Sequence, residues 1–316
     1  MKYNLLTLVS VLFIVSNASS QNGKIIEQKQ YTFADTTISK IEKRIPNAKA
    51  LLDAVDFFKI TYLSDGLKVN GYMCAPKKAG NYPCVIFNRG GNRDFGTIND
   101  IMLFRFFAEV SSWGYVVVGS QYRGNAGGEG KEEFGGSDVN DVVNLIPLLS
   151  DVEKADTARI GMYGWSRGGM MTYLALTKTD KIKAAIIGSG MADAFIMTKK
   201  RPEMDTVFSE LAPGYFQNRD SVLKLRSAVY WVEKISPETP LLLLTGSADW
   251  RVSPEEQLEM VNKLYEIKHP LRFMLFEGGQ HSLIEHTDEV NHAARTFLDT
   301  YVRDRKTFPS LEPHGN

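Results

Sequence analysis

The sequence predicts an α/β fold built on a mostly parallel, doubly wound sheet with helices on both faces. The first observation behind this prediction is that, from residue 82 onward, short apolar runs alternate with longer stretches of helical periodicity. The second is a pair of alternating runs before residue 76, which indicates a leading β-hairpin. The chain has 316 residues, 43% of them hydrophobic and 23% charged, a composition typical of a globular protein with a sizeable core. One large domain therefore accounts for most of the chain.

The first elements after the N-terminus are expected to differ from the main domain. Residues 21–55 are mixed and polar, with one possible helix at about 38–55, and are predicted to form an N-terminal extension that packs on the domain. Residues 56–62 and 67–75 alternate between apolar and polar side chains around the tight-turn sequence Ser64-Asp65-Gly66. These two runs form the predicted hairpin.

The alternating part of the chain supplies the predicted parallel strands and the helices that cover them. The expected strands are 83–88, 115–120, 158–163, 183–188, 240–246 and 271–276. The expected helices are 100–113, 138–149, 170–176, 254–267 and 288–303. We expect the main domain to span 56–305 and to be followed by a C-terminal tail, 306–316.

A long insertion at about 190–238 interrupts this alternation. It carries many large apolar side chains among charged ones, which suits helices that lie over the carboxyl edge of the sheet. Two interpretations remain open for it: additional packing, or a lid that contacts a substrate.

The N-terminus resembles a secretory signal peptide. Lys2 precedes an apolar run at 5–15, and the small residues Ala18 and Ser20 suit cleavage near Gln21. The apolar run is too short to span a bilayer, although a buried strand or an uncleaved anchor is the alternative. We therefore predict that residues 1–20 are removed and that the protein is exported to the periplasm or secreted, without a stable membrane anchor.

The composition argues against several classes of partner. The formal net charge is zero, and the basic run 199–201 is too short for more than a solvated loop, so no nucleic acid is expected. Cys74 and Cys84 both lie in strand-like segments, where buried free thiols are expected more often than a disulfide. The five histidines are scattered and no Cys/His ligand spacing occurs, so neither a metal nor another cofactor is predicted.

The segment around Ser166 carries the chemistry. Gly164 and Gly168 frame Ser166 between an apolar run and a helical pattern, the strand-turn-helix order of a nucleophile elbow. A serine hydroxyl needs a base within hydrogen-bond reach and a carboxylate that orients this base. Ser166 is therefore the predicted nucleophile.

Two later loops can supply the acid and the base. Asp249 lies in the loop that follows strand 240–246, and His281 lies in the glycine-containing loop that follows strand 271–276. The order serine, acid, histidine, with each residue after a strand, is the order found when a nucleophile elbow is present. Asp249 could instead cap the next helix, and His286 is the alternative base, but we predict Asp249 and His281.

The tetrahedral intermediate also needs hydrogen-bond donors for its oxyanion. The backbone N–H of Arg167, which directly follows the nucleophile, is one predicted donor. The loop after strand 83–88 contains Arg89, Gly90 and Gly91, and its glycines let backbone amides approach a substrate, so we predict the N–H of Gly90 as the second donor. A merely tight turn is the alternative.

With these motifs in place, residues from about 55 to 305 resemble the catalytic domain of the prolyl oligopeptidase family of α/β-hydrolases. The segments that carry the resemblance are Ser64-Asp65-Gly66, Gln121 to Gly128 with Tyr122-Arg123-Gly124, Asp138 with Asp141, the Trp165-Ser166-Arg167-Gly168-Gly169 elbow, Gly246 to Val252, and the His281 loop. The resemblance implies an α/β-hydrolase fold with Ser166 as nucleophile, Asp249 as acid and His281 as base. Tyr122, Trp165 and Trp250 stand within these motifs and are further candidates for substrate contact.

The sequence departs from the family in two ways. Family peptidases usually carry an N-terminal β-propeller that filters substrates, and the 55 residues before this domain cannot form one. Arg89 occupies a position that is His or Tyr in the family's glycine motif, and Asn92 replaces its proline. A tyrosine donor to the oxyanion is thus missing there, so the Gly90 N–H or the Arg89 side chain must serve. Arg89 could also pair with an acidic group of the substrate.

The resulting prediction is an exported serine hydrolase that cleaves small peptides through an acyl-serine intermediate. The same residues support ester cleavage equally well, so a carboxylesterase, including one that deacylates a carbohydrate, is the alternative. An inactive hydrolase fold kept as a binding module is a third interpretation, which the intact set of three residues disfavours.

Overall fold

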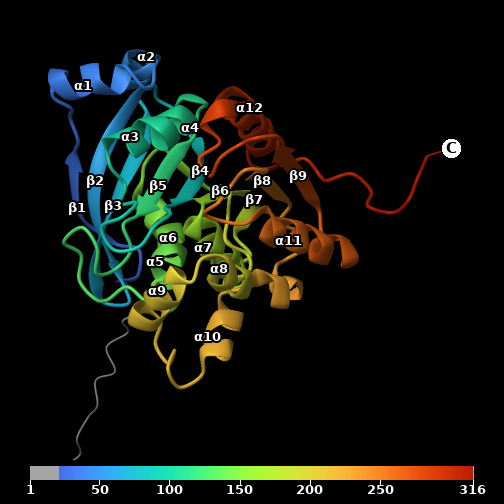
Figure 1. The fold of residues 1–316 in the computed structure, drawn as a ribbon. Helices are drawn as coiled ribbons and strands as arrows, with labels where there is room; N and C mark the ends of the chain where they lie inside the picture. Colours follow the sequence, from blue (N-terminus) through green and yellow to red (C-terminus); the bar gives the residue numbers. More distant parts are fainter. Residues whose placement is uncertain (1–20, 316) are drawn as a thin grey trace, which may run out of the picture.

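The computed structural model describes residues 21–315, so the expected signal peptide at residues 1–20 lies outside the described residues. One nine-stranded sheet organises this part of the chain (Figure 1). Its strands are β1 (Ile25–Gln30), β2 (Val55–Ser64), β3 (Leu67–Pro76), β4 (Tyr82–Asn88), β5 (Val116–Ser120), β6 (Ala155–Trp165), β7 (Ile182–Gly188), β8 (Leu241–Gly246) and β9 (Leu271–Phe276). Their order across the sheet is β1-β2-β3-β5-β4-β6-β7-β8-β9.

The strands from β5 to β9 pair in parallel, whereas β1, β2 and β3 pair antiparallel at one side of the sheet. Parallel neighbours need crossover connections, and helices provide most of them. The helices are α1 (Asp35–Glu42), α2 (Ala48–Ala54), α3 (Asp100–Met102), α4 (Glu109–Ser112), α5 (Val139–Val143), α6 (Leu145–Leu148), α7 (Arg167–Leu176), α8 (Ala194–Lys200), α9 (Glu203–Leu211), α10 (Arg219–Leu225), α11 (Pro254–Glu266) and α12 (Thr287–Leu298). The doubly wound α/β-hydrolase architecture is therefore confirmed.

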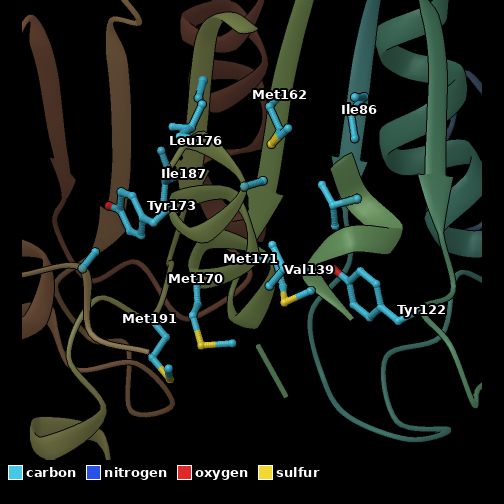
Figure 2. Close-up of a cluster of buried hydrophobic side chains, with 14 of the residues drawn as sticks. Ile86, Tyr122, Val139, Met162, Met170, Met171, Tyr173, Leu176, Ile187 and Met191 are labelled. Atoms are coloured by element: carbon cyan, nitrogen blue, oxygen red, sulfur yellow. The ribbon is translucent and has the colours of Figure 1, made fainter. Parts of the chain in front are cut away.

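Both faces of the sheet are buried, and strand alternation divides the core into two clusters. In β8, Leu241 and Leu243 point to one cluster, while Leu242 and Leu244 point to the other. Helices α5 to α11 cover the first face, and α1 to α4 with α12 cover the second. Figure 2 shows part of the first cluster, where side chains of α7 pack on those of β4, β6 and β7. This packing fixes the helix that follows the predicted nucleophile.

The predicted strands and hairpin are confirmed to within a few residues, but the prediction for the N-terminal extension missed a strand. β1 pairs antiparallel with β2, so the segment extends the sheet instead of only packing on it. The single helix expected at about 38–55 is two helices, α1 and α2, because the Pro46 that separates them cannot continue a helix. The C-terminal tail adds no element after Arg303, and Glu312 in it contacts Lys268.

Two expected helices are less regular than their apolar periodicity indicates. The helix expected at 100–113 contains a π-helical segment, Leu103–Ala108, between α3 and α4. The helix expected at 138–149 is divided at Asn144 into α5 and α6. The π-helical segment contributes to the candidate site, because its residue Phe106 lines the pocket described below.

The remaining expectations concern the two cysteines, a membrane span and a metal site. Cys74 and Cys84 are buried, as expected, and are separate free thiols. Among the described helices, none combines the length and the apolar character needed to cross a membrane. Residues 21–315 also contain no group of three or more His, Cys, Asp or Glu side chains that could hold a metal ion.

Candidate active site

The predicted catalytic residues lie at the carboxyl ends of four strands that are neighbours or near neighbours in the sheet. Ser166 follows β6, Asp249 follows β8, His281 follows β9, and the glycine loop with Gly90 follows β4. Carboxyl ends of parallel strands meet at one edge of the sheet. Ser166, Gly90, Arg167 and His281 accordingly line one pocket, which encloses about 220 Å³.

Ser166 has the backbone conformation of a nucleophile elbow. Its φ of 60° and ψ of −125° are strained for a residue with a side chain. The turn requires glycine on both sides, because a Cβ at Gly164 would overlap Gly168 O and one at Gly168 would overlap Asn88 O. The Ser166 N–H donates to Gly188 O at 2.9 Å, and Ser166 O accepts from Met191 N at 3.1 Å. These bonds hold the turn against β7 and the segment that follows it.

The predicted acid and the predicted base are joined directly. His281 Nδ1 lies 2.8 Å from Asp249 Oδ2, and because an ionised carboxylate only accepts, Nδ1 carries the proton in this bond. The other oxygen, Asp249 Oδ1, accepts from the backbone N–H groups of Arg251 and Val252 at 2.8 and 3.0 Å. The alternative base, His286, faces elsewhere, with its Nε2 3.1 Å from Glu277 O.

The two predicted oxyanion donors flank Ser166. Arg167 is the first residue of α7, where backbone N–H groups have no acceptor within the helix. Gly90 comes so close to Ser166 that a Cβ there would lie 3.0 Å from Ser166 Cβ and 3.1 Å from Trp165 O. The glycine is therefore required for the close approach of the two loops.

The structure corrects the predicted substrate roles of Arg89 and Tyr122. Both side chains are fully buried and neither lines the pocket. Arg89 donates to backbone carbonyls, among them Gln121 O at 2.9 Å and Gly90 O at 3.0 Å, and Tyr122 Oη donates to Arg89 O at 3.0 Å. Burial, together with the nearby Arg167, lowers the pKa of Arg89 to about 10. Arg89 therefore stabilises the loop that contains Gly90 from the buried side, by hydrogen bonds to backbone carbonyls.

Arg167 forms a second buried anchor for this loop. Its guanidinium pairs with Glu132 and with Asp138, the latter at 2.7 Å, and donates to Gly91 O at 3.0 Å. Burial opposes ionisation of Glu132, but Arg167, the Arg93 N–H and the Asn125 side chain together outweigh this effect, so the pKa of Glu132 is lowered. The charge of Arg167 is thus compensated inside the protein.

The pocket is largely apolar. Its remaining lining residues are Phe87, Gly91, Asn92, Phe95, Gly96, Met102, Phe106, Phe134, Trp165, Met191, Met197, Arg201, Met204, Arg251 and Val252. Trp165 lines it, and its Nε1 donates to His281 O at 3.0 Å, which connects the elbow to the histidine loop. The exposed Trp250 is not among the lining residues, and its contact with a substrate stays a prediction.

The insertion contributes to this pocket through Met191, Met197, Arg201 and Met204. Its other large side chains, such as Phe208 and Trp231, are buried, so the segment serves both packing and the pocket. Sequence reasoning missed Arg201, which was assigned to a solvated loop, and it passed over Arg251. Arg251 lies two residues after the predicted acid, Asp249, and this proximity could have indicated that Arg251 belongs to the site.

Comparison with known proteins now identifies the family. The sequence profile described as "Prolyl oligopeptidase family" matches residues 103–304, well over half of the chain. The chain belongs to the prolyl oligopeptidase family. This membership places it among the serine hydrolases, and specifically with the peptidases.

Individual relatives within the prolyl oligopeptidase family are distant. An uncharacterized peptidase of Bacillus subtilis, YtmA, is 28% identical over 228 residues, which cover 72% of this chain and 86% of that protein. A second one, YuxL, is 25% identical over 232 residues, which cover 69% of this chain and 34% of that protein. The structure of Pyrococcus horikoshii acylaminoacyl peptidase matches with a TM-score of 0.70 and 20% identity, over 84% of this chain and 45% of that one. The chain thus spans most of one relative and less than half of the others.

Behind the pocket of this prolyl oligopeptidase family member lies a buried carboxyl group that the sequence analysis did not select. Glu256 in α11 accepts from the backbone N–H groups of Ala192 and Asp193, both at 3.2 Å. Burial, with a contribution from the nearby Asp193 carboxylate, raises the pKa of Glu256 to about 8. The group therefore stays protonated at neutral pH and fixes the start of the insertion.

We expect Glu256→Gln to become more stable than the wild type as the pH rises. Folded Glu256 holds its proton up to about pH 8, whereas the unfolded side chain loses it near its ordinary pKa of 4.5, so the wild type loses stability across this interval. Gln does not titrate and keeps an acceptor for the two N–H groups. Thermal unfolding from pH 4 to 9 should show a Tm difference that opens by a few degrees in favour of the variant. Parallel curves at all pH values would contradict the assignment.

Proposed function

We propose that this protein is an exported serine peptidase that cleaves peptide bonds through an acyl-enzyme formed on Ser166. The observation that carries the proposal is the bond of 2.8 Å between Asp249 and His281, in a pocket that His281 shares with Ser166. Membership of the prolyl oligopeptidase family supports peptide substrates. The peptidase names of relatives such as YtmA support them as well.

In the proposed mechanism His281 acts first as base and then as acid. Ser166 Oγ attacks the carbonyl carbon of the scissile bond, and His281 Nε2 takes the hydroxyl proton. The backbone N–H groups of Arg167 and Gly90 stabilise the oxyanion. When the C–N bond breaks, His281 returns the proton to the leaving amine, and water then releases the acyl group from Ser166 by the same steps.

Asp249 is the orienting group of this set. It holds the imidazole by Nδ1, so that Nε2 is left to accept the serine proton, and it stabilises the imidazolium that forms. The two N–H groups that bind Asp249 Oδ1 fix the carboxylate in turn.

Covalent labelling tests the nucleophile. A fluorophosphonate probe is expected to modify Ser166 in the wild type, as mapped by mass spectrometry, and to leave Ser166→Ala unmodified. Absence of labelling in folded wild-type protein would contradict an active serine and favour a binding module.

A substrate panel tests the peptidase assignment. Peptidyl p-nitroanilides and p-nitrophenyl esters with the same acyl groups should both be hydrolysed, because the same acyl-enzyme serves both leaving groups. Hydrolysis of the esters with no cleavage of any amide at matched concentration would instead establish a carboxylesterase.

Export rests on the sequence pattern of residues 1–20. Expression of the full chain in a bacterial host, followed by fractionation, should place the protein outside the cytoplasm with a new N-terminus near Gln21. Retention in the cytoplasm with an intact N-terminus would contradict this part of the proposal.

A further inference from the structure

The active-site pocket contains a pair of arginines that the proposed mechanism does not use. We infer that Arg251 and Arg201 form an anion subsite that receives a carboxylate of the substrate, so that this enzyme prefers short acidic substrates. The inference rests on the proposed function and adds a substrate class to it. Both residues line the same pocket as Ser166 and His281.

Arg251 is held in place without an anionic partner. Its guanidinium carbon lies 5.5 Å from the ring centre of Phe95 and 5.0 Å from that of Trp250, so two aromatic rings fix its position. In residues 21–315 no side chain or backbone oxygen accepts a hydrogen bond from the Arg251 guanidinium, and no carboxylate pairs with it. Its five donors are therefore open to a ligand.

Arg201 extends the subsite from the insertion. It directly follows α8, donates from Nη1 to Arg251 O at 3.0 Å, and lies 5.3 Å from the ring centre of Trp250. Its Nε pairs at 2.8 Å with Glu203, whose side chain is mostly exposed, so Arg201 is only partly compensated. Phe95, Arg251 and Arg201 thus line the pocket, and the exposed Trp250, which is not a lining residue, contacts both guanidinium groups.

The charges of the lining side chains indicate that the ligand of this pocket is negatively charged. Three arginines and one histidine line it, and among the described residues no Asp or Glu does. The charge of Arg167 is compensated by Glu132 and Asp138, whereas that of Arg251 is not. An ammonium group would be repelled in this pocket, and a planar carboxylate fits the guanidinium fork.

The carboxylate can lie on either side of the scissile bond, and paired substrates distinguish the two cases. On the acyl side, succinyl-Phe is compared with its neutral carboxamide, succinamoyl-Phe, each as p-nitroanilide and as p-nitrophenyl ester. On the leaving side, acetyl-Phe-Ala with a free terminal carboxylate is compared with its terminal amide. The measured quantity is the ratio of kcat/KM within each pair, for wild type and variants.

The wild type should favour the carboxylate in one of the pairs by roughly 10- to 100-fold, the range for a hydrogen bond to a charged group. Arg251→Gln should bring this ratio to about 1, Arg201→Gln should lower it, and Arg251→Lys should keep part of it because the charge remains. The preference should also weaken as salt is added. The matched control is Lys200→Gln, which removes one positive charge next to Arg201, from a side chain that pairs with Glu255 outside the pocket, and should leave the ratio unchanged.

Two results would overturn the inference. One is equal turnover of carboxylate and carboxamide in all pairs by the wild type, which would leave the proposed function intact. The other is a preference that survives in folded Arg251→Gln. If the wild type hydrolyses none of the amides or esters, the proposed function itself is wrong and the inference falls with it.

Discussion

Asp249→Asn should lower kcat/KM by about ten thousandfold while the fold is retained. The carboxylate accepts from His281 Nδ1 through Oδ2 and from two backbone N–H groups through Oδ1. In the variant, the amide oxygen keeps the backbone bonds and the amide nitrogen faces His281. That nitrogen only donates, so Nδ1 must become the acceptor and the proton moves to Nε2. A protonated Nε2 cannot take the proton of Ser166.

The controls for this prediction separate chemistry from folding. Thermal unfolding should change little, because Asn is isosteric with Asp and the two backbone bonds persist. Labelling of Ser166 by the fluorophosphonate should slow in parallel with turnover, since both need the base. A variant that unfolds normally and keeps more than about a tenth of the wild-type rate would contradict the role of Asp249.

The residues of this constellation could be predicted because local sequence determines where each one lies. Ser166, Asp249 and His281 each follow an apolar strand by a few residues, and parallel strands bring their carboxyl ends to one edge. The two glycines around Ser166 are likewise a local requirement of the turn. The fold class followed from the same alternation of strands and helices.

The surroundings of the constellation depend on contacts between distant segments, which periodicity does not reveal. Arg89 stands beside the catalytic loop in the sequence, yet the carbonyl of Gln121, 32 positions later, draws its side chain into the core. Arg201 belongs to a short basic run in the sequence, and only the placement of α8 brings it to the pocket. β1 was missed because its side chains are mostly exposed, so it carries no apolar pattern.

The second large effect is expected for Arg167→Met. Arg167 compensates Glu132 and Asp138, whose side chains are 4% and 0% exposed. Its removal leaves two buried carboxylates without their cation, which costs about 3–5 kcal/mol of the free energy of unfolding. The glycine loop also loses the bond to Gly91 O, so the misplaced oxyanion donor should reduce kcat by up to about a hundredfold.

Arg159→Met is the matched control for Arg167→Met, because Arg159 also pairs with a carboxylate, Asp156, at 2.7 Å, but with both side chains more than a fifth exposed. A pair of that kind contributes only about 0–1 kcal/mol, so the free energies of unfolding of the two variants, measured by chemical denaturation, should differ clearly.

The loss of stability in Arg167→Met should become smaller as the pH falls towards about 4. Arg167 helps to lower the pKa of Glu132 in the wild type, so without this cation Glu132 becomes protonated and neutral more readily. Adding Glu132→Gln to Arg167→Met should restore part of the stability at neutral pH, since one of the uncompensated charges is then gone. Equal losses in the free energy of unfolding for Arg167→Met and Arg159→Met would show instead that the buried ion pairs contribute no more than surface ones.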